Sequence, residues 1–335
     1  MKMLYHETGS TWAPYNLAME EALTETVRPD YGGCFLLWQN SPAVIIGRHQ
    51  NAVGEVNLPE LARRGITLVR RMTGGGAVYH DLGNLNFSFI LPQEEGLEMR
   101  RLLQPIMDYL AKRGLQVGME GRNDLSITGV GKFSGLASRR LPGKYQLHGT
   151  IMHEVDLGVL EHVLLVDPEK YKNKGVASVK ARVANLRPFL PIDLAELWAG
   201  LKAAYGAEAA AIPEKTRQRA QRLAEDKYSQ DSWNIGQGPR ADIFLKKRFP
   251  FGSLELHLET SRNKISAAKI TGDFLTPSNT DDQIAVEELA EALVSLPADD
   301  AESWGRAWAR FELARAFHGQ VDEAEVRGWL AAALA

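Results

Sequence analysis

Along the first third of the chain, hydrophobic and polar positions alternate in short runs that are typical of β-strands. The apolar runs Cys34–Trp38 and Ala43–Ile46 flank an Asn-Ser-Pro turn, which predicts two strands joined by that turn. In Asn84–Leu91 the apolar residues fall on one face, and Asn86 and Ser88 fall on the other. We therefore expect a half-buried strand whose polar face could line a cleft.

Segments with helical spacing lie between these runs. Residues 16–27 predict an acidic amphipathic helix, and residues 99–113 predict a helix that ends at Gly114. Asn57, followed by Pro59 and Glu60, has the form of a helix N-cap, and Gly65 would end that helix. The remaining expected elements are helices at 194–205, 214–225 and beyond 286, and strands at 66–71, around 125 and 135, and at 145–152, 244–258 and 264–270.

The order of these elements predicts the fold class and the domains. Strands joined by short turns, with helices between them, favour a mixed and largely antiparallel sheet over regular βαβ winding. At about 226–243 the chain becomes polar and rich in Ser, Gln, Asn and Gly, which indicates a linker. We predict an α/β (α+β) protein with a large domain, residues 1–245, and a small α/β domain, residues 246–335.

Composition narrows the class of protein. A net charge of −3 gives no broad basic field for binding nucleic acid, and no apolar run is long enough to span a bilayer. Because the N-terminal residues lack the apolar core of a signal peptide, we expect a cytoplasmic protein. Cys34 is the only cysteine, which excludes an intrachain disulfide and a multi-thiolate metal site.

The strongest chemical signal is the segment from Arg70 to Asp81, Arg-Arg-Met-Thr-Gly-Gly-Gly-Ala-Val-Tyr-His-Asp. Consecutive glycines allow positive φ and a close approach to a ligand, and their N–H groups can form an anion-binding nest. Arg70 and Arg71 add positive charge and fork-shaped donors. A flexible hairpin with incidental basic residues is the alternative, but Thr73 and His80 beside the glycines favour a loop that binds phosphate or carboxylate. The segment is neither a Walker loop nor a GxGxxG turn.

A lysine and an aspartate form the second signal. Lys132 lies between glycines ahead of an expected strand, so its ammonium could reach a cleft. There it could stabilise negative charge on an α-phosphate and on the carbonyl oxygen of an acyl adenylate. A surface lysine in a glycine turn is the alternative. Asp124, in a Gly-Arg-Asn-Asp segment, could hold a metal ion or a ribose hydroxyl, or serve as a cap.

Two further features have open interpretations. His148 interrupts an apolar strand, and is either a core histidine paired with a carbonyl or a residue that lines a pocket. The stretch 172–186 is basic and contains a glycine, so it either folds over a nucleotide as a lid or is an ordinary solvated loop.

Together these segments resemble the lipoate–protein ligase family, and the match follows the family's order along almost the whole chain. Any one segment is weak evidence, whereas all of them in order are highly specific. Met72 and Lys180 depart slightly from the family pattern, which has a more polar residue and an arginine there. The matching segments are 14–21, 45–51, 71–84, 121–125, 132–135, 148–150 and 178–186, with 233–237 and 272–274 similar to the small C-terminal domain of the full-length ligases.

The resemblance implies a large domain of the biotin- and lipoate-ligase type and a two-step reaction. Lipoate and MgATP would give lipoyl-AMP and pyrophosphate, and a lysine of an acceptor protein would then displace AMP. The implied acceptors are lipoyl domains of 2-oxoacid dehydrogenase E2 subunits and the H-type protein of glycine cleavage. The expected enzyme is a monomer that binds neither nucleic acid nor membrane. The ligands of Mg²⁺ are unassigned, except that Asp124 lies where the ion could bind.

Carried over position by position, the resemblance also implies site residues. Lys132 would be the catalytic residue, in contact with the adenylate phosphate and the acyl carbonyl. The residues implied to bind ATP or lipoyl-AMP are Arg71, Gly75, Gly76, Ala77, Val78, Tyr79, Asn84, Asn123, Asp124, Lys132, Ser178 and Arg182. The residues implied to bind lipoate are Leu17, Met19, Trp38, Arg71, Thr73, Gly74, Lys132 and His148.

Other functions compete with this interpretation. A related group transfers octanoyl chains through a cysteine thioester without ATP, but Cys34 lies in an apolar run and is better interpreted as a buried core residue. A biotin ligase shares the chemistry but has a different fingerprint. A catalytically silent lipoyl-binding or scaffold protein is disfavoured by the presence of both Lys132 and the arginine–glycine loop.

Overall fold

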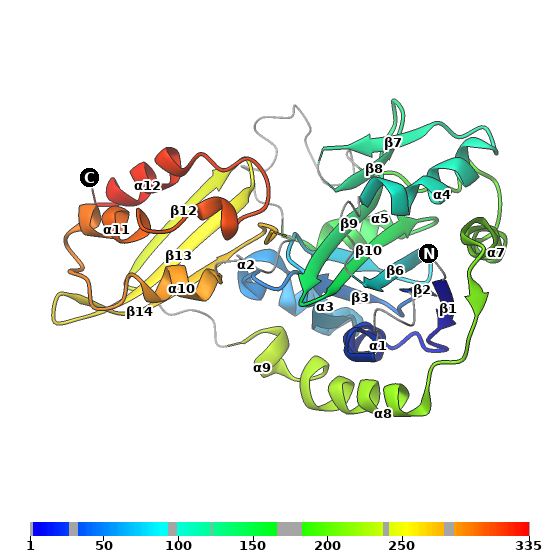
Figure 1. Cartoon of the computed structure of the whole chain (residues 1–335), viewed down its shortest axis with the longest axis horizontal. Helices are drawn as coiled ribbons and strands as arrows, with labels where there is room; N and C mark the ends of the chain where they lie inside the picture. The colour runs from blue at the N-terminus through cyan, green and yellow to red at the C-terminus, as the bar shows by residue number, and fades with distance from the viewer. Residues whose placement is uncertain are drawn as a thin grey trace.

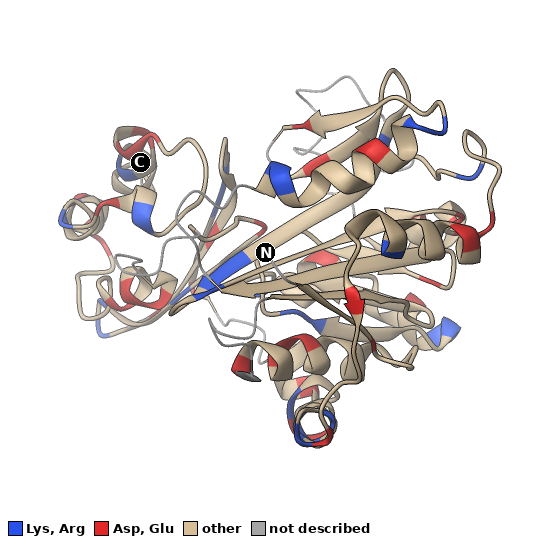
Figure 2. Cartoon of the chain, turned by 45° about the vertical axis from the view of Figure 1, so that its right-hand side comes forward, with Lys and Arg blue, Asp and Glu red and all other residues tan. Residues whose placement is uncertain are grey.

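The computed structural model describes residues 3–26, 33–92, 99–121, 123–165, 183–236, 241–277 and 285–334. The chain forms a large lobe around an eight-stranded sheet and a smaller lobe at its C-terminal end (Figure 1). Among the described residues, no helix has the length and hydrophobicity needed to cross a bilayer. Basic and acidic residues are interspersed along the ribbon of both lobes in the view of Figure 2.

The large sheet has the strand order β11-β1-β2-β6-β10-β9-β8-β7. β1 pairs parallel with β2 and β11, and the remaining neighbours pair antiparallel. The sheet is therefore mixed and mostly antiparallel, as the sequence predicts. Its strands are β1 (Met3–Glu7), β2 (Gly33–Trp38), β6 (Asn84–Pro92), β7 (Val117–Glu120), β8 (Asp124–Ile127), β9 (Gly131–Leu141), β10 (Lys144–Met152) and β11 (Glu208–Ala209).

Helices cover both faces of this sheet, and alternate side chains of its strands enter two hydrophobic clusters. Phe35 and Phe89 pack with residues of α4 and α7, whereas Leu36 and Ile90 pack with residues of α1 and α8. The helices are α1 (Ala13–Thr26), α4 (Met99–Ala111), α7 (Leu194–Tyr205) and α8 (Glu214–Leu223), which continues into a π-helical turn (Ala224–Tyr228) before α9 (Asp231–Asn234).

A three-stranded sheet lies beside the large one and has the order β4-β3-β5. Its strands are β3 (Ala43–Ile46), β4 (Thr67–Arg70) and β5 (Val78–His80), accompanied by α2 (Ala52–Glu55), α3 (Leu58–Arg64) and α5 (Leu157–Val163). The predicted cap of α3 is confirmed, because the Asn57 side chain accepts a hydrogen bond from the Glu60 N–H at 3.3 Å and Gly65 ends the helix at φ 65°.

The C-terminal lobe is an antiparallel sheet, β12-β13-β14, packed against short helices around a core of its own. Trp304 and Trp308 are fully buried in that core. The elements are β12 (Ile243–Phe249), β13 (Gly252–Ser261), β14 (Lys264–Gly272), α10 (Val286–Glu291), α11 (Ala301–Trp308), a 3-10 turn (Leu313–Arg315) and α12 (Glu323–Ala331).

Two details differ from the sequence prediction. Residues 244–258 form a hairpin of β12 and β13 rather than one strand, because the chain turns between Phe249 and Gly252. β6 is buried along its whole length rather than half-buried. Its polar face is turned toward α1 instead of solvent, since Ser88 donates a hydrogen bond of 2.5 Å to Glu20 of that helix.

Candidate active site

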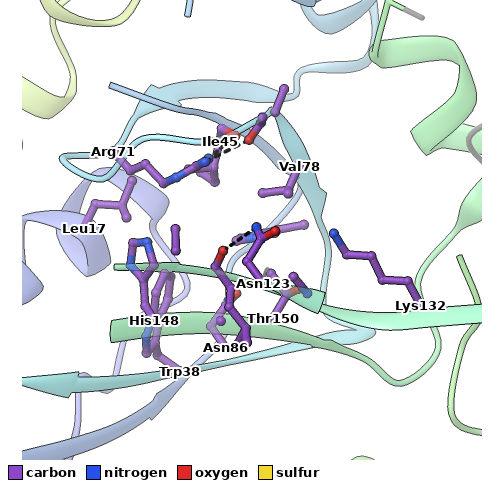
Figure 3. Close-up of a pocket in the computed structure, with 18 residues that line it drawn as sticks. Leu17, Trp38, Ile45, Arg71, Val78, Asn86, Asn123, Lys132, His148 and Thr150 are labelled. Atoms are coloured by element: carbon purple, nitrogen blue, oxygen red, sulfur yellow. Dashed lines mark hydrogen bonds between the residues drawn. The ribbon is translucent and has the colours of Figure 1, made fainter. Parts of the chain in front are cut away.

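A cavity of about 130 Å³ opens where α1, the three-stranded sheet and the large sheet meet. Figure 3 shows Lys132 on one side of this cavity and Leu17, Trp38 and His148 on the other, so we name its two ends the Lys132 end and the Trp38 end. The lining residues are Leu17, Trp38, Ile45, Arg71, Gly75, Gly76, Ala77, Val78, His80, Asn86, Asn123, Lys132, Gly135, Leu136, Ala137, His148, Gly149 and Thr150.

The loop that contains Gly74, Gly75 and Gly76, which we call the glycine loop, forms one wall of the cavity. Hydrogen bonds from the Arg71 side chain fix its shape. The Arg71 guanidinium donates to the carbonyls of Gly74 and Gly76 at 2.6 and 2.9 Å, and to the Ile45 carbonyl at 3.2 Å. Burial lowers the pKa of Arg71 to about 10, so the side chain stays cationic at neutral pH. Arg71 therefore supplies fixed positive charge and shapes the loop, while Gly76 faces open space.

Arg70 lies on the other side of the same loop, and backbone carbonyls likewise occupy its guanidinium donors. It donates to the carbonyls of Gly47, Gln50, Trp233 and Asn234 at 2.6–3.0 Å. Its donors thus tie β4 to the chain after β3 and to α9, and they do not point into the cavity as the sequence suggests for a ligand-binding arginine.

The C-terminal lobe touches the back of the glycine loop. The Gly75 N–H donates to the Phe274 carbonyl at 3.1 Å, and the Gly272 N–H donates to the His49 carbonyl at 3.0 Å. A Cβ on Gly74 would lie 2.6 Å from the Phe274 oxygen. Gly74 is therefore required by close packing against the second lobe.

At the Lys132 end, a lysine and an aspartate from neighbouring strands face each other. The Lys132 ammonium lies 2.7 Å from a carboxylate oxygen of Asp124, and both side chains are about a quarter to a third exposed, at 31% and 25%. A Cβ on Gly135 would lie 2.9 Å from the Lys132 Nζ, so glycine at 135 leaves room for the ammonium. A positive charge is thus held at the mouth of the cavity, within reach of solvent.

At the Trp38 end, His148 belongs to a buried chain of hydrogen bonds. Its Nδ1 lies 3.0 Å from a Glu20 oxygen, and its Nε2 lies 2.7 Å from the Thr73 hydroxyl. Since Arg71 Nε donates to Thr73 at 3.1 Å, the hydroxyl proton is free to go to His148 Nε2, which leaves the Nδ1 proton for Glu20. Burial opposes ionisation of Glu20, but the hydrogen bonds from His148 and Ser88 prevail and lower its pKa.

Comparison with known proteins assigns this site to a family. Residues 13–206 match the profile of the lipoyl protein ligase A/B catalytic domain, and residues 238–330 match that of the bacterial lipoate protein ligase C-terminus. The chain belongs to the lipoate–protein ligase family. Its members are enzymes, and lipoate–protein ligase 1 of Staphylococcus aureus is 34% identical over 319 residues, 93% of this chain and 94% of the relative.

Solved structures of lipoate ligases share the fold. P. falciparum LipL1 in complex with lipoate superposes with a TM-score of 0.80 at 20% identity, over 98% of this chain and 99% of that one. The ligase of the bipartite system of Thermoplasma acidophilum, studied with its E2 lipoyl domain, gives a TM-score of 0.62 at 31% identity, over 70% and 96%. A lipoate–protein ligase A bound with ATP gives 0.60 at 28% identity, over 70% and 98%.

The structure brings most of the residues expected to bind lipoate or nucleotide to one cavity. Those that line it are Leu17, Trp38, Arg71, Gly75, Gly76, Ala77, Val78, Asn123, Lys132 and His148, with Asp124 beside Lys132. Those that do not line it are Met19 and Tyr79, which are buried in hydrophobic clusters, Thr73 and Asn84, which support lining residues, and Gly74, which meets the second lobe. Ser178, Arg182 and most of the expected lid lie outside the described residues.

The sequence analysis did not assign several residues of the site, and three of them have ionisable or amide side chains. Glu20 pairs with His148, and His80 and Asn86 line the cavity. The sequence does point to Asn86, because the alternating pattern of β6 places this residue on the polar face of the strand, which was expected to line a cleft. Cys34 is buried away from the cavity, and burial raises the pKa of its thiol to about 11, which disfavours a nucleophilic role as predicted.

Proposed function

We propose that this enzyme activates lipoate with ATP to lipoyl-AMP and then transfers the lipoyl group to a lysine of an acceptor lipoyl domain. The observation that carries the proposal is a cavity that combines an apolar interior, a glycine loop along one wall and the Lys132 ammonium at one end. An acyl chain fits the apolar part, and the charged groups of the activated acid fit the Lys132 end.

In the first step, a lipoate carboxylate oxygen would bond to the α-phosphorus of ATP as the bond to pyrophosphate breaks. Lys132 is placed to stabilise the charge that develops on the α-phosphate oxygens. The backbone of Gly75 and Gly76 allows close approach of the phosphate, and the fixed charge of Arg71 lies behind it.

In the second step, the uncharged acceptor amine attacks the acyl carbonyl, AMP leaves with the bonding electrons, and the amine releases a proton to solvent. Because the mixed anhydride is already reactive, no enzyme nucleophile is needed. Lys132, between the acyl carbonyl and the phosphate, would stabilise the oxyanion. The burial of Cys34 agrees with a route that uses no thioester.

A magnesium ion that accompanies ATP fits this site only as an ion held mainly by the nucleotide. Asp124 offers one carboxylate, already paired with Lys132, and the described residues contain no group of three or more acidic or histidine side chains suited to a metal. Mg²⁺ commonly takes one or two protein carboxylates and keeps phosphate and water ligands. When bound, it would neutralise phosphate charge beside Asp124.

The acceptors that we propose are the lipoyl domains of 2-oxoacid dehydrogenase E2 subunits and the H-type protein of glycine cleavage. The Thermoplasma ligase, studied with its E2 lipoyl domain, supports this class. We further propose that the large lobe is the catalytic domain and that the C-terminal lobe, which begins with β12 near the predicted boundary at residue 245, is an accessory domain. We also propose that the enzyme acts as a cytoplasmic monomer.

Mass spectrometry of a purified apo lipoyl domain tests the proposal. The domain is incubated with the enzyme, lipoate and MgATP, and a parallel reaction contains octanoyl carrier protein and no ATP. We expect a mass gain of one lipoyl group only when ATP is present. A gain only in the ATP-free reaction would show an acyltransferase instead, and no gain with either E2 or H-type acceptor would refute the ligase.

A further inference from the structure

Two polar groups at the Trp38 end of the cavity have no hydrogen-bond partner among the described residues. They are Nε2 of His80 and Nδ2 of Asn86, on side chains from residues that are 3% and 1% exposed. Both residues line the cavity. Both also adjoin Trp38, since the His80 ring meets the Trp38 ring edge-on at 6.3 Å and Asn86 is the register partner of Trp38 across β2 and β6.

A chain of amides fixes the proton of His80. The Asn16 Nδ2 faces two backbone carbonyls, those of Ser10 at 3.0 Å and Gln39 at 2.8 Å, which sets the orientation of its amide. The same nitrogen donates to the Asn40 Oδ1 at 2.9 Å, so the Asn40 Nδ2 is the group that donates to the His80 Nδ1 at 3.1 Å. Because Nδ1 accepts, Nε2 carries the ring proton.

The imidazole remains uncharged at neutral pH. Burial, reinforced by the nearby positive charge of Arg71, lowers the pKa of His80 to about 3. In Asn86 the Oδ1 accepts a hydrogen bond of 2.9 Å from the Asn84 Nδ2, and its own Nδ2 is left as a donor. The Trp38 end therefore holds two buried N–H donors among apolar walls.

We propose that His80 and Asn86 determine specificity by donating to the ring sulfurs of the lipoyl group, and so favour lipoate over the unsubstituted acyl chain of octanoate. This rests on the proposed function, in which the activated carboxyl group lies at the Lys132 end and the acyl tail extends toward Trp38. The two ring sulfurs of lipoate form a disulfide, and such divalent sulfur is a weak acceptor, as in methionine, whereas a hydrocarbon chain accepts nothing. Octanoate would thus fill the cavity and leave both donors unsatisfied.

Substitution by smaller residues distinguishes the effect of a lost hydrogen-bond donor from the effect of a larger cavity. Asn86→Ala and His80→Val each remove one donor and enlarge the cavity, so a purely steric effect would improve the relative binding of the bulkier lipoate. Loss of a donor should instead lower the preference for lipoate, because bound octanoate then no longer leaves an unpaired donor at that position. Ser126→Ala is the control, since the Ser126 hydroxyl is also buried without a partner among the described residues but lies outside the cavity lining.

Isothermal titration calorimetry of lipoate and of octanoate gives the ratio of their dissociation constants for each full-length protein, without ATP or acceptor. We expect the wild type to prefer lipoate by about tenfold or more, and each cavity variant to reduce that ratio by about five- to tenfold. Ser126→Ala should keep the wild-type ratio. Thermal melting curves show whether each variant is folded. If one of the two cavity variants is misfolded, the ratio of dissociation constants measured for the other one tests the proposal.

A wild type that binds both acids equally, or cavity variants whose ratio is unchanged or increased, would overturn this inference even if ATP-dependent lipoylation is observed. A wild type that prefers lipoate but forms no lipoyl product with any acceptor would instead refute the proposed function and leave the recognition of sulfur standing. The two failures are therefore distinguishable.

Discussion

The polar groups at the two ends of the cavity differ in how exposed they are and in how firmly hydrogen bonds fix them. At the Lys132 end, the ammonium and its Asp124 partner are 31% and 25% exposed, and they can reorganise around an incoming charge. At the Trp38 end, the Glu20 and His148 side chains are only 3% and 10% exposed and are fixed by a chain of hydrogen bonds. We therefore expect substitutions at the Lys132 end to change the rate of chemistry, and those at the Trp38 end to change stability and ligand selection.

The largest effect is expected from Lys132→Ala. Loss of a group that stabilises developing charge commonly lowers kcat by about 10²–10³. Pyrophosphate release in the presence of lipoate and ATP measures this step without an acceptor. Lys215→Ala, an exposed lysine of α8, is the control and should retain full activity. Unchanged pyrophosphate release in Lys132→Ala would remove the lysine from the mechanism.

Glu20→Gln should act mainly on stability. Because its folded-state pKa is lowered, ionised Glu20 contributes stability above its unfolded pKa of about 4.3, and this contribution is lost as pH falls below it. We expect a loss of about 1–3 kcal/mol at pH 7 that stays constant down to about pH 4.3 and shrinks only below it. Denaturant unfolding at several pH values, with the exposed Glu25→Gln of the same helix as control, measures it. A loss of stability that does not change below about pH 4.3 would contradict the ionisation of Glu20 in the folded protein.

Gly135→Ala should affect rate with little change in stability. The added methyl group would lie 2.9 Å from the Lys132 Nζ, so the flexible lysine must move its ammonium. A displacement of this kind is expected to lower the rate of pyrophosphate release by about tenfold, with the melting temperature nearly unchanged. Gly118→Ala, whose added Cβ meets nothing within 4 Å, should behave as wild type. Equal rates for both variants would show that the position of Lys132 is not limiting.

The smallest effect is expected from Cys34→Ala. Removing a buried thiol costs about 1 kcal/mol of stability, and ligation should continue at the wild-type rate because the thiol is neither ionised nor near the cavity. The mass-spectrometric assay with lipoate and ATP checks this. Complete loss of turnover in a folded Cys34→Ala protein would revive the thioester transferase.

Features of the fold that depend on residues close together in the sequence could be predicted. The cap of α3 depends on Asn57, Glu60 and Gly65, all within one short segment, and it was predicted correctly. The turn between β12 and β13 was missed, because the apolar pattern continues through Phe249 and Phe251, which are both buried in the core of the second lobe.

Long-range features of the site were less accessible. Glu20 and His148 are 128 positions apart, and only the fold reveals that α1 faces β10 closely enough for their hydrogen bond. Arg70 and Arg71 were predicted to carry free donors. In the structure Arg70 is engaged by carbonyls that include those of Trp233 and Asn234, far away in sequence, and Arg71 by those of Gly74 and Gly76 in its own loop, whose folding the sequence did not reveal. The lipoyl specificity came from resemblance alone, and the donor groups of His80 and Asn86 emerged only from the structure.

The central claim is that this enzyme forms an acyl adenylate before it meets the acceptor. The most direct measurement incubates the enzyme with lipoate and MgATP in the absence of any acceptor and analyses the products by mass spectrometry. The account predicts lipoyl-AMP and pyrophosphate, and release of AMP once an apo lipoyl domain is added. Formation of ADP and phosphate, or lipoylation of the acceptor with no adenylate and no pyrophosphate, would contradict it.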